Sequence, residues 1–218
     1  MHVQPFTLGP FPTNGYVAHD AGEAAIVDAP SATTEEHRQV IRYVEEQDLD
    51  VRHLLLTHAH IDHILGATAL AEHFGAAWRL HPADRPFAEQ AEEQGAAFGV
   101  PVKANPPLGA PLAEGDEIAV GDARLEVLHA PGHAPGHVIF LERGAGVALS
   151  GDVLFRGSIG RVQGLPQTSL EQLMRSIEAK LMALPDETRL HPGHGEATAV
   201  GRERIENPFL NGEVSTAE

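Results

Sequence analysis

The segment HAHIDH at positions 58–63 places three histidines and an aspartate directly after an apolar run. Imidazole and carboxylate groups are costly to bury unless they are paired or bind a metal ion. In an extended loop, side chains two residues apart point the same way, so His58 and His60 can reach one ion. Asp62 and His63 lie where a helix is expected to begin, so they point elsewhere and could reach a second ion. The segment therefore predicts a metal site.

Three later segments carry further donors of the same kind: PGHAPGH at 131–137, SGD at 150–152 and HPGHG at 191–195. His133 could complete a three-histidine site with the first pair, which leaves one coordination position open for water, as in catalytic zinc sites. Asp62, His63 and one histidine of the last segment would hold the second ion. Asp152 follows a predicted strand, and its carboxylate could bridge the two ions.

Two divalent cations at such a site favour hydrolysis. Metal binding lowers the pKa of water to roughly 7, so hydroxide exists at neutral pH. Two ions about 3.5–4 Å apart can both polarise a substrate and generate the nucleophile. The chain has no cysteine, which excludes thiolate ligands and disulfides. Imidazole and carboxylate ligands suit zinc, iron and manganese alike, and we expect two divalent ions, with zinc the first choice and iron or manganese the alternatives.

Composition limits the partners. The 218 residues include 15 Lys and Arg against 31 Asp and Glu, a net charge of −16 that repels phosphate backbones, so no nucleic-acid partner is expected. The N-terminal residues lack the layout of a signal peptide, and no apolar run approaches the ~18 residues of a membrane span. We therefore expect a cytoplasmic protein of one domain, residues 1–218, with no membrane partner. The oligomeric state is not indicated.

The elements that must position these residues alternate between strand and helix, followed by a strand-rich middle and a last helix. Strands are predicted at 23–30, 51–57, 76–80 and 188–195, and hairpins at 116–131 and 136–152. Helices are predicted at 33–47, 63–74, 83–99 and 168–184, with capping boxes formed by Thr33 with Glu36 and by Thr168 with Glu171. Every histidine cluster follows a predicted strand. Two mixed sheets packed face to face, with helices outside, would bring these loops together at one edge.

These residues resemble the metallo-β-lactamase superfamily, whose mark is His-x-His-x-Asp-His. The match is complete at 58–63 and continues in order through PGHAPGH, SGDVLFRGSIGR, HPGHG and NPFL. Within the superfamily the chain looks most like the small bacterial glyoxalase-II-like hydrolases. The resemblance implies an α+β fold, a four-layer αββα sandwich of two mixed sheets. It also implies a small-molecule thioester substrate, such as an S-2-hydroxyacyl (lactoyl) thiol.

The resemblance also assigns the ligands residue by residue. It places the first ion on His58, His60 and His133. The second ion falls on Asp62, His63 and His194, with Asp152 between the two. In the family the C-terminal ligand sits in a Gly-His pair, which favours His194 over His191. Asp62 and Asp152 would be the catalytic carboxylates.

Several further residues have two interpretations. His137 is expected to orient a neighbouring ligand, and His191 either does the same or is structural. Arg156 and Arg161 could bind a carboxylate of the thiol carrier, or form surface salt bridges. The segment 83–99 could cover the metal cleft or be a solvated amphipathic helix. The tail residues Asn207, Pro208 and Phe209 could pack towards the site or simply anchor the C-terminus.

Two rival functions remain open. Mononuclear iron persulfide dioxygenases share positions like His58, His60, His133 and Asp152, so the motif discriminates poorly against them. Lactonase-like or β-lactamase-like hydrolases are the second rival, and a panel of substrates would distinguish them. Longer glyoxalase II enzymes grip glutathione with a basic C-terminal helical segment that this sequence, ending at Glu218, does not contain. Another low-molecular-weight thiol is therefore an alternative carrier.

Overall fold

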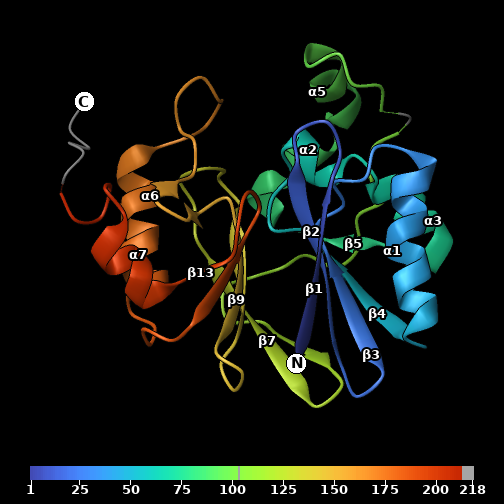
Figure 1. Cartoon of the computed structure of the whole chain (residues 1–218). Coiled ribbons are helices and arrows are strands. Elements are labelled where there is room, and N and C mark those ends of the chain that lie inside the picture. The colour runs from blue at the N-terminus through green and yellow to red at the C-terminus, as the bar shows by residue number, and fades with distance from the viewer. Residues whose placement is uncertain (103, 213–218) are drawn as a thin grey trace.

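The computed structural model describes residues 1–102 and 104–212. Two β-sheets pack face to face, with helices on the two outer faces (Figure 1). Both sheets contain parallel and antiparallel pairs, so the predicted α+β sandwich of two mixed sheets is confirmed. In the described ranges, no helix combines the length and the hydropathy that crossing a membrane requires.

The first sheet contains five strands in chain order: β1 (His2–Leu8), β2 (Thr13–Asp20), β3 (Glu23–Val27), β4 (Asp50–Leu55) and β5 (Trp78–Arg79). The last three are parallel, and parallel neighbours need a crossover connection. Helix α1 (Thr34–Glu46) supplies the first crossover, and helices α2 (Ile61–Ile64) and α3 (Ala67–Phe74) lie in the second. The carboxyl ends of β3 and β4 therefore meet at one edge, where the loop carrying HAHIDH begins.

The second sheet has the order β13-β12-β9-β8-β7-β6. Its strands are β6 (Glu117–Val120), β7 (Ala123–His129), β8 (Val138–Glu142), β9 (Val147–Gly151), β12 (Arg189–Pro192) and β13 (Thr198–Ala199). Helix α6 (Leu170–Ser176), the π-helical turn η2 (Ile177–Leu181) and helix α7 (Val200–Glu206) cover its outer face. A short ribbon, β10 (Leu154–Phe155) with β11 (Ser158–Ile159), follows Asp152.

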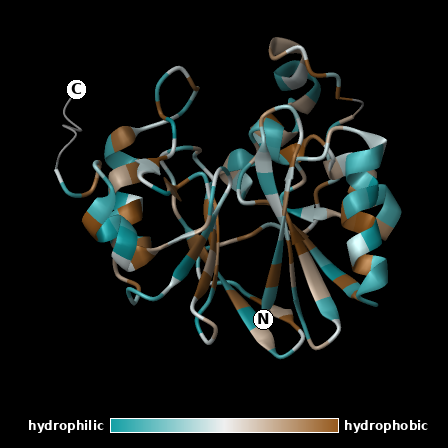
Figure 2. Cartoon of the chain, viewed as in Figure 1, coloured by the Kyte–Doolittle hydropathy of each residue, from teal (hydrophilic) through white to brown (hydrophobic). Residues whose placement is uncertain are grey.

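Buried side chains form three apolar layers, and neighbours along a strand point into different ones because strand periodicity is two. Ile26 and Leu54 pack towards the helices of the first sheet, whereas Val27 and Leu55 pack between the sheets. A third layer fills the space between the second sheet and α6, η2 and α7. Figure 2 shows hydrophobic and hydrophilic residues mixed on α1, as expected for a helix with one face on a sheet and the other in solvent.

Local signals predicted several elements correctly. Helix α1 has the expected capping box: Thr33 Oγ1 accepts from Glu36 N (3.2 Å), and Glu36 Oε2 accepts from Thr33 N (3.0 Å). The predicted hairpins are β6–β7 and β8–β9. Strands 23–30, 51–57, 76–80 and 188–195 correspond to the shorter β3, β4, β5 and β12.

Other predictions need correction. The helix predicted at 63–74 is divided into α2 and α3, with Gly66 between them; a Cβ there would lie 2.2 Å from Ser31 Oγ. The segment 83–99 forms three pieces, the 3₁₀ turn η1 (Pro82–Asp84), α4 (Arg85–Ala88) and α5 (Ala91–Ala97). Its first piece, η1, ends at Asp84. The buried carboxylate of Asp84 accepts hydrogen bonds from two loops that carry predicted metal ligands. Strands β1 and β2 and helix α7 were not predicted.

The second capping box is also wrong. Ser169, rather than Thr168, is the N-cap of α6, and its Oγ accepts from Gln172 N (3.2 Å). The Thr168 hydroxyl instead donates to Val162 O (2.5 Å), which closes the loop before the helix. Glu171 pairs with Arg175 one turn further on.

Candidate metal centre

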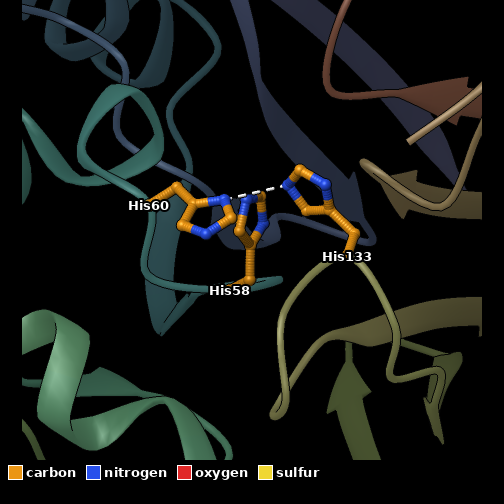
Figure 3. Close-up of side chains that lie close together, drawn as sticks. All are labelled: His58, His60 and His133. Atoms are coloured by element: carbon orange, nitrogen blue, oxygen red, sulfur yellow. Dashed lines mark hydrogen bonds between the residues drawn. The ribbon is translucent and has the colours of Figure 1, made fainter. Parts of the chain in front are cut away.

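Three imidazoles from distant parts of the chain meet at the end of the sandwich. Figure 3 shows the rings of His58, His60 and His133 facing one another. One ring nitrogen of each lies within 4.8 Å of the other two, and all three side chains are buried. His60 Nδ1 is 2.9 Å from His133 Nε2. His58 and His60 come from the loop after β4, and His133 comes from the loop between β7 and β8, so both sheets contribute.

A second group of donors lies beside the first. Asp62 Oδ2 is 3.1 Å from His194 Nε2 and 3.5 Å from His63 Nε2, and the ligand atoms of all three residues lie within 4.8 Å. Asp62 and His63 occupy α2, whereas His194 follows β12. Asp62 and His63 belong to the second group because helix α2 turns the chain away after His60.

Asp152 touches both groups. Its Oδ1 lies 3.4 Å from His63 Nε2. Its Oδ2 lies 3.5 Å from both His133 Nε2 and His194 Nε2. The carboxylate therefore stands between the two groups, as expected for a bridging ligand.

The donor atoms themselves indicate a cation. His58 Nε2, His63 Nε2 and Asp152 Oδ1 are buried without a hydrogen-bond partner among the described residues. Unpaired buried polar atoms cost free energy, and coordination to a divalent ion would satisfy each of them. The residues present therefore fit a metal centre.

The ring nitrogens on the far side of the site are held by acceptors of the protein. His63 Nδ1 donates to Asp28 Oδ2 (2.8 Å), and His133 Nδ1 donates to Arg161 O (2.7 Å). His194 Nδ1 lies 3.3 Å from Pro12 O. Bonds of this kind fix the tautomer and leave Nε2 free for a metal.

Asp28 was missed by the sequence analysis. Its carboxylate accepts from His63 Nδ1, from Thr57 Oγ1 (2.7 Å) and from Thr57 N (2.8 Å). Thr57 Oγ1 is in turn 3.1 Å from His58 Nδ1, so Asp28 orients one histidine of each donor group. The available signal was an aspartate directly after the apolar strand β3.

Asp84 was missed as well. It is fully buried, and its two oxygens accept from Ala59 N (2.9 Å) and Gly136 N (2.5 Å). It therefore joins the loop of His58 and His60 to the loop of His133. Burial raises the pKa of Asp84 to about 6, against the opposing effect of the two amide donors.

The two donor groups differ in the charge of their side chains. Burial and the surrounding imidazoles hold the pKa of His58 well below its ordinary value and that of His60 at about 3, so both rings are neutral donors. Burial lowers the pKa of His63, but the carboxylates around it outweigh this and raise the pKa well above the ordinary value. Burial would raise the pKa of Asp62, but His63 and His194 hold it at about 2. A cation in the second group would displace the protons of these histidines.

The two other predicted histidines lie in different surroundings. His137 Nε2 accepts from Asp152 N (2.9 Å), and its ring stacks on that of His58 with centroids 4.7 Å apart. It therefore positions a donor residue. His191 packs edge-on against the ring of Tyr16, with centroids 5.5 Å apart. Burial lowers the pKa of His191 to about 4.

The predicted arginines and tail also differ in position. Arg156 pairs with Glu196 at the surface, whereas Arg161 lines the cleft above the metal site, and its Nε donates to Gln163 O (2.8 Å). Asn207 is buried, and its Nδ2 donates to Ser158 O (3.0 Å) and to Glu203 Oε2 (2.9 Å). The tail thus anchors the ribbon β10–β11 that follows Asp152.

Comparison with known proteins agrees with this geometry. Residues 8–194 match the metallo-β-lactamase superfamily. The chain is 38% identical to the hydroxyacylglutathione hydrolase GloC of Haemophilus influenzae, over 97% of this chain and 99% of that protein. The crystal structure of the BLEG-1 B3 metallo-β-lactamase superposes with a TM-score of 0.87 at 33% identity, covering 96% of this chain and 99% of that one. The structure of TTHA1623 in a di-iron-bound form superposes with a TM-score of 0.85 at 38% identity, covering 95% and 100%. The chain therefore belongs to the metallo-β-lactamase superfamily.

Proposed function

We propose that this protein is a binuclear metal-dependent hydrolase that cleaves a thioester, with an S-2-hydroxyacyl thiol such as a lactoyl thioester as the substrate class. The family and the His and Asp donors make the chain a metallo-hydrolase. The observation that carries the binuclear assignment is the position of Asp152, which contacts both donor groups. The relative named as a hydroxyacylglutathione hydrolase, 38% identical over nearly the whole chain, supports the thioester.

The proposed chemistry follows from the donors. His58, His60 and His133 would hold one ion, and Asp62, His63 and His194 the other. Bound divalent cations supply hydroxide at neutral pH and polarise a carbonyl group. Imidazole and carboxylate ligands suit both zinc and iron. We take zinc as the resident ion in this proposal and keep iron as the alternative.

The remaining work falls to the protein's own residues. Asp62 stays ionised and lines the cleft, so its carboxylate can accept a hydrogen bond from the attacking oxygen and orient it. Hydrolysis joins that oxygen to the acyl carbon and breaks the C–S bond, and sulfur leaves with the bonding electrons. Because an ordinary thiol has a pKa of about 8.5, thiolate leaves without a general acid. Asp28 and His137 keep the donors in place.

The test combines metal content with turnover. Protein purified without added metal is analysed by mass spectrometry and assayed with S-lactoylglutathione, before and after chelation. We expect two ions per chain, loss of hydrolysis on chelation and recovery with zinc. Unchanged turnover after the metal is removed would contradict the proposal. A single iron with oxygen uptake on a persulfide would instead identify a dioxygenase.

A further inference from the structure

A cleft of about 510 Å³ opens directly over the metal site. Its floor includes donor residues of both groups, and its volume lies in the range of small-molecule sites. Its walls are largely apolar and include Phe11, Phe87, Phe98, Phe155, Leu165 and Pro166. We call these six residues the apolar wall. The cleft is therefore where a substrate's arm must lie while its carbonyl group is at the metals.

The aromatic rings are arranged from the metals outward. The ring of Phe87 stands edge-on to His60 (5.7 Å), and that of Phe155 stands edge-on to His194 (6.0 Å), so each donor group has one phenyl ring beside it. Further out, Phe11 and Phe98 form an edge-to-face pair with centroids 5.8 Å apart. Phe98 directly follows α5, which lies at the same end of the sandwich as α2 (Figure 1).

Phe98 is unusual in its exposure. Its side chain is 55% exposed, and only Ile205 is also a large exposed hydrophobic residue among the described positions. An exposed phenyl ring at the rim of a cleft gains free energy when an apolar ligand covers it. Phe98 therefore favours an apolar occupant at the outer part of the cleft.

The cleft offers little to an anionic carrier. Among the described residues that line it, Arg161 is the only one with a permanent positive charge, and its Nε is already bonded to Gln163 O. The whole chain carries a net charge of −16. Away from the donor residues at its floor, the cleft would therefore offer one guanidinium group to a carrier with two carboxylates, such as glutathione.

We propose that the apolar wall selects thioesters whose thiol arm is apolar and uncharged, such as an arylalkyl thiol, over the glutathione conjugate. This rests on the proposed thioester hydrolase activity and names its substrate class. Phe98 and Phe11 are specificity-determining residues in this assignment. Covering a phenyl-sized group is worth roughly a 10- to 100-fold gain in affinity.

The first experiment compares three lactoyl thioesters on the zinc-loaded enzyme. Their thiol arms are glutathione, N-acetylcysteamine (uncharged and polar) and phenylmethanethiol (uncharged and apolar). We expect kcat/KM to rise in that order, with the last at least tenfold above the first. A higher kcat/KM for the glutathione conjugate than for the phenylmethyl thioester would overturn the inference while leaving the hydrolase assignment intact.

The second experiment removes the exposed phenyl ring at the rim of the cleft. Phe98→Ala should lower kcat/KM for the phenylmethyl thioester about tenfold and change that for lactoylglutathione less than twofold. Ile205→Ala, which removes the other large exposed apolar side chain of the described residues, on α7, is the matched control and should change neither. An equal loss with all three substrates would show a structural effect of Phe98 and contradict the inference.

A binding measurement separates this inference from the proposed function. Benzyl methyl sulfide carries the apolar arm but has no thioester, and its binding is followed by saturation-transfer NMR. We expect binding to the native chain that Phe98→Ala weakens about tenfold and Ile205→Ala leaves unchanged. If no thioester is hydrolysed but this pattern holds, only the proposed activity fails. Equally tight binding of benzyl methyl sulfide to the native chain and to Phe98→Ala would overturn the inference that the cleft selects an apolar arm.

Discussion

The Asp28 carboxylate accepts three hydrogen bonds, and it holds His63 with Nε2 directed at the metal site. No other acceptor for His63 Nδ1 is found among the described residues. The residue also occupies a left-handed backbone conformation (φ 61°), which asparagine tolerates as well as aspartate. Asparagine therefore tests the charge and the acceptors without changing the local backbone.

Asp28→Asn should weaken metal binding and hydrolysis by roughly 10- to 100-fold, as for other residues that orient metal-binding histidines. The physical reason is that an amide has one acceptor oxygen for three donors. Metal titration and kcat/KM measure the effect. Asp186→Asn, at an exposed surface ion pair with Arg204, is the control. Native metal affinity in the Asp28 variant would contradict the role given to Asp28.

His191 gives a prediction about the stability of the folded chain at acid pH. Its folded-state pKa of about 4 lies below the ordinary histidine value because the ring is buried. The unfolded chain therefore binds the proton more tightly, so this contribution to stability is present above about pH 6.5 and is lost as the pH falls towards 4. At about 1.4 kcal/mol per pKa unit, the loss is about 3 kcal/mol.

His191→Phe retains a ring against Tyr16 and removes the titrating group. Urea unfolding at pH 7 and pH 4.5 should show a smaller drop in the free energy of unfolding for the variant than for the native chain. An identical drop in both proteins would show that protonation of His191 contributes nothing.

At the scale of elements, the loops that carry donors are tied to one another and to helices. Asp84, at the end of η1, joins the loop after β4 to the loop between β7 and β8. The second of these loops also contacts α6, because Ser169 N donates to Gly132 O (2.8 Å). A Cβ at Gly132 would lie 2.2 Å from Leu173 N, so the loop and the helix touch at backbone distance.

Asp84→Asn should reduce the free energy of unfolding by about 1–3 kcal/mol, because one of two buried amides loses its acceptor. It should also weaken zinc binding, since His58, His60 and His133 would no longer be held in register. Calorimetry and zinc titration measure the two effects. Loss of stability with unchanged zinc affinity would limit Asp84 to a structural role.

The cap of α6 gives a paired test. Ser169→Ala should cost about 1 kcal/mol of unfolding free energy, because the Gln172 amide loses its acceptor. Glu171→Ala, at the position that the sequence pattern selects for the capping box, should cost less than half as much because its partner Arg175 is exposed. Chemical denaturation of both variants shows whether Ser169 or the predicted capping box of Thr168 with Glu171 stabilises the start of α6.

At the scale of the whole molecule, the metal site joins the two sheets. His58, His60, Asp62 and His63 follow strands of the first sheet, whereas His133, Asp152 and His194 follow strands of the second. The sheets also meet at this edge through Asn14 N, which donates to Gly193 O (2.7 Å). Cations bound here would act as cross-links between the two halves of the sandwich.

Metal removal should therefore lower the thermal stability. A ligand present at 100 times its Kd stabilises the folded state by about 2.7 kcal/mol. We expect a lower Tm after chelation, restored by zinc, in scanning calorimetry. An unchanged Tm in protein shown to have lost its metal would contradict a cross-link between the sheets.

The sequence alone determined the features that depend on neighbours along the chain. The α1 capping box, the two hairpins and the end of α3 at Gly75 follow from residues a few positions apart. The seven predicted ligands also come together as expected, because each follows a strand and the fold brings those strand ends to one edge. Spacing of residue types was sufficient for the local elements and for the donor segments, whereas the choice of His194 within HPGHG came from the family resemblance.

The tertiary structure decided whatever depends on a distant partner. Asp28 and Asp84 matter because of loops that lie up to about 50 residues away. Thr168 lost the cap position to Ser169 because its hydroxyl closes a preceding loop. Of the two interpretations of Arg156, the surface salt bridge is the one found, with Glu196. The apolar wall of the cleft likewise gathers residues from separate segments. A hydrogen bond or contact between remote residues leaves no periodic trace in the sequence, so only the folded chain reveals it.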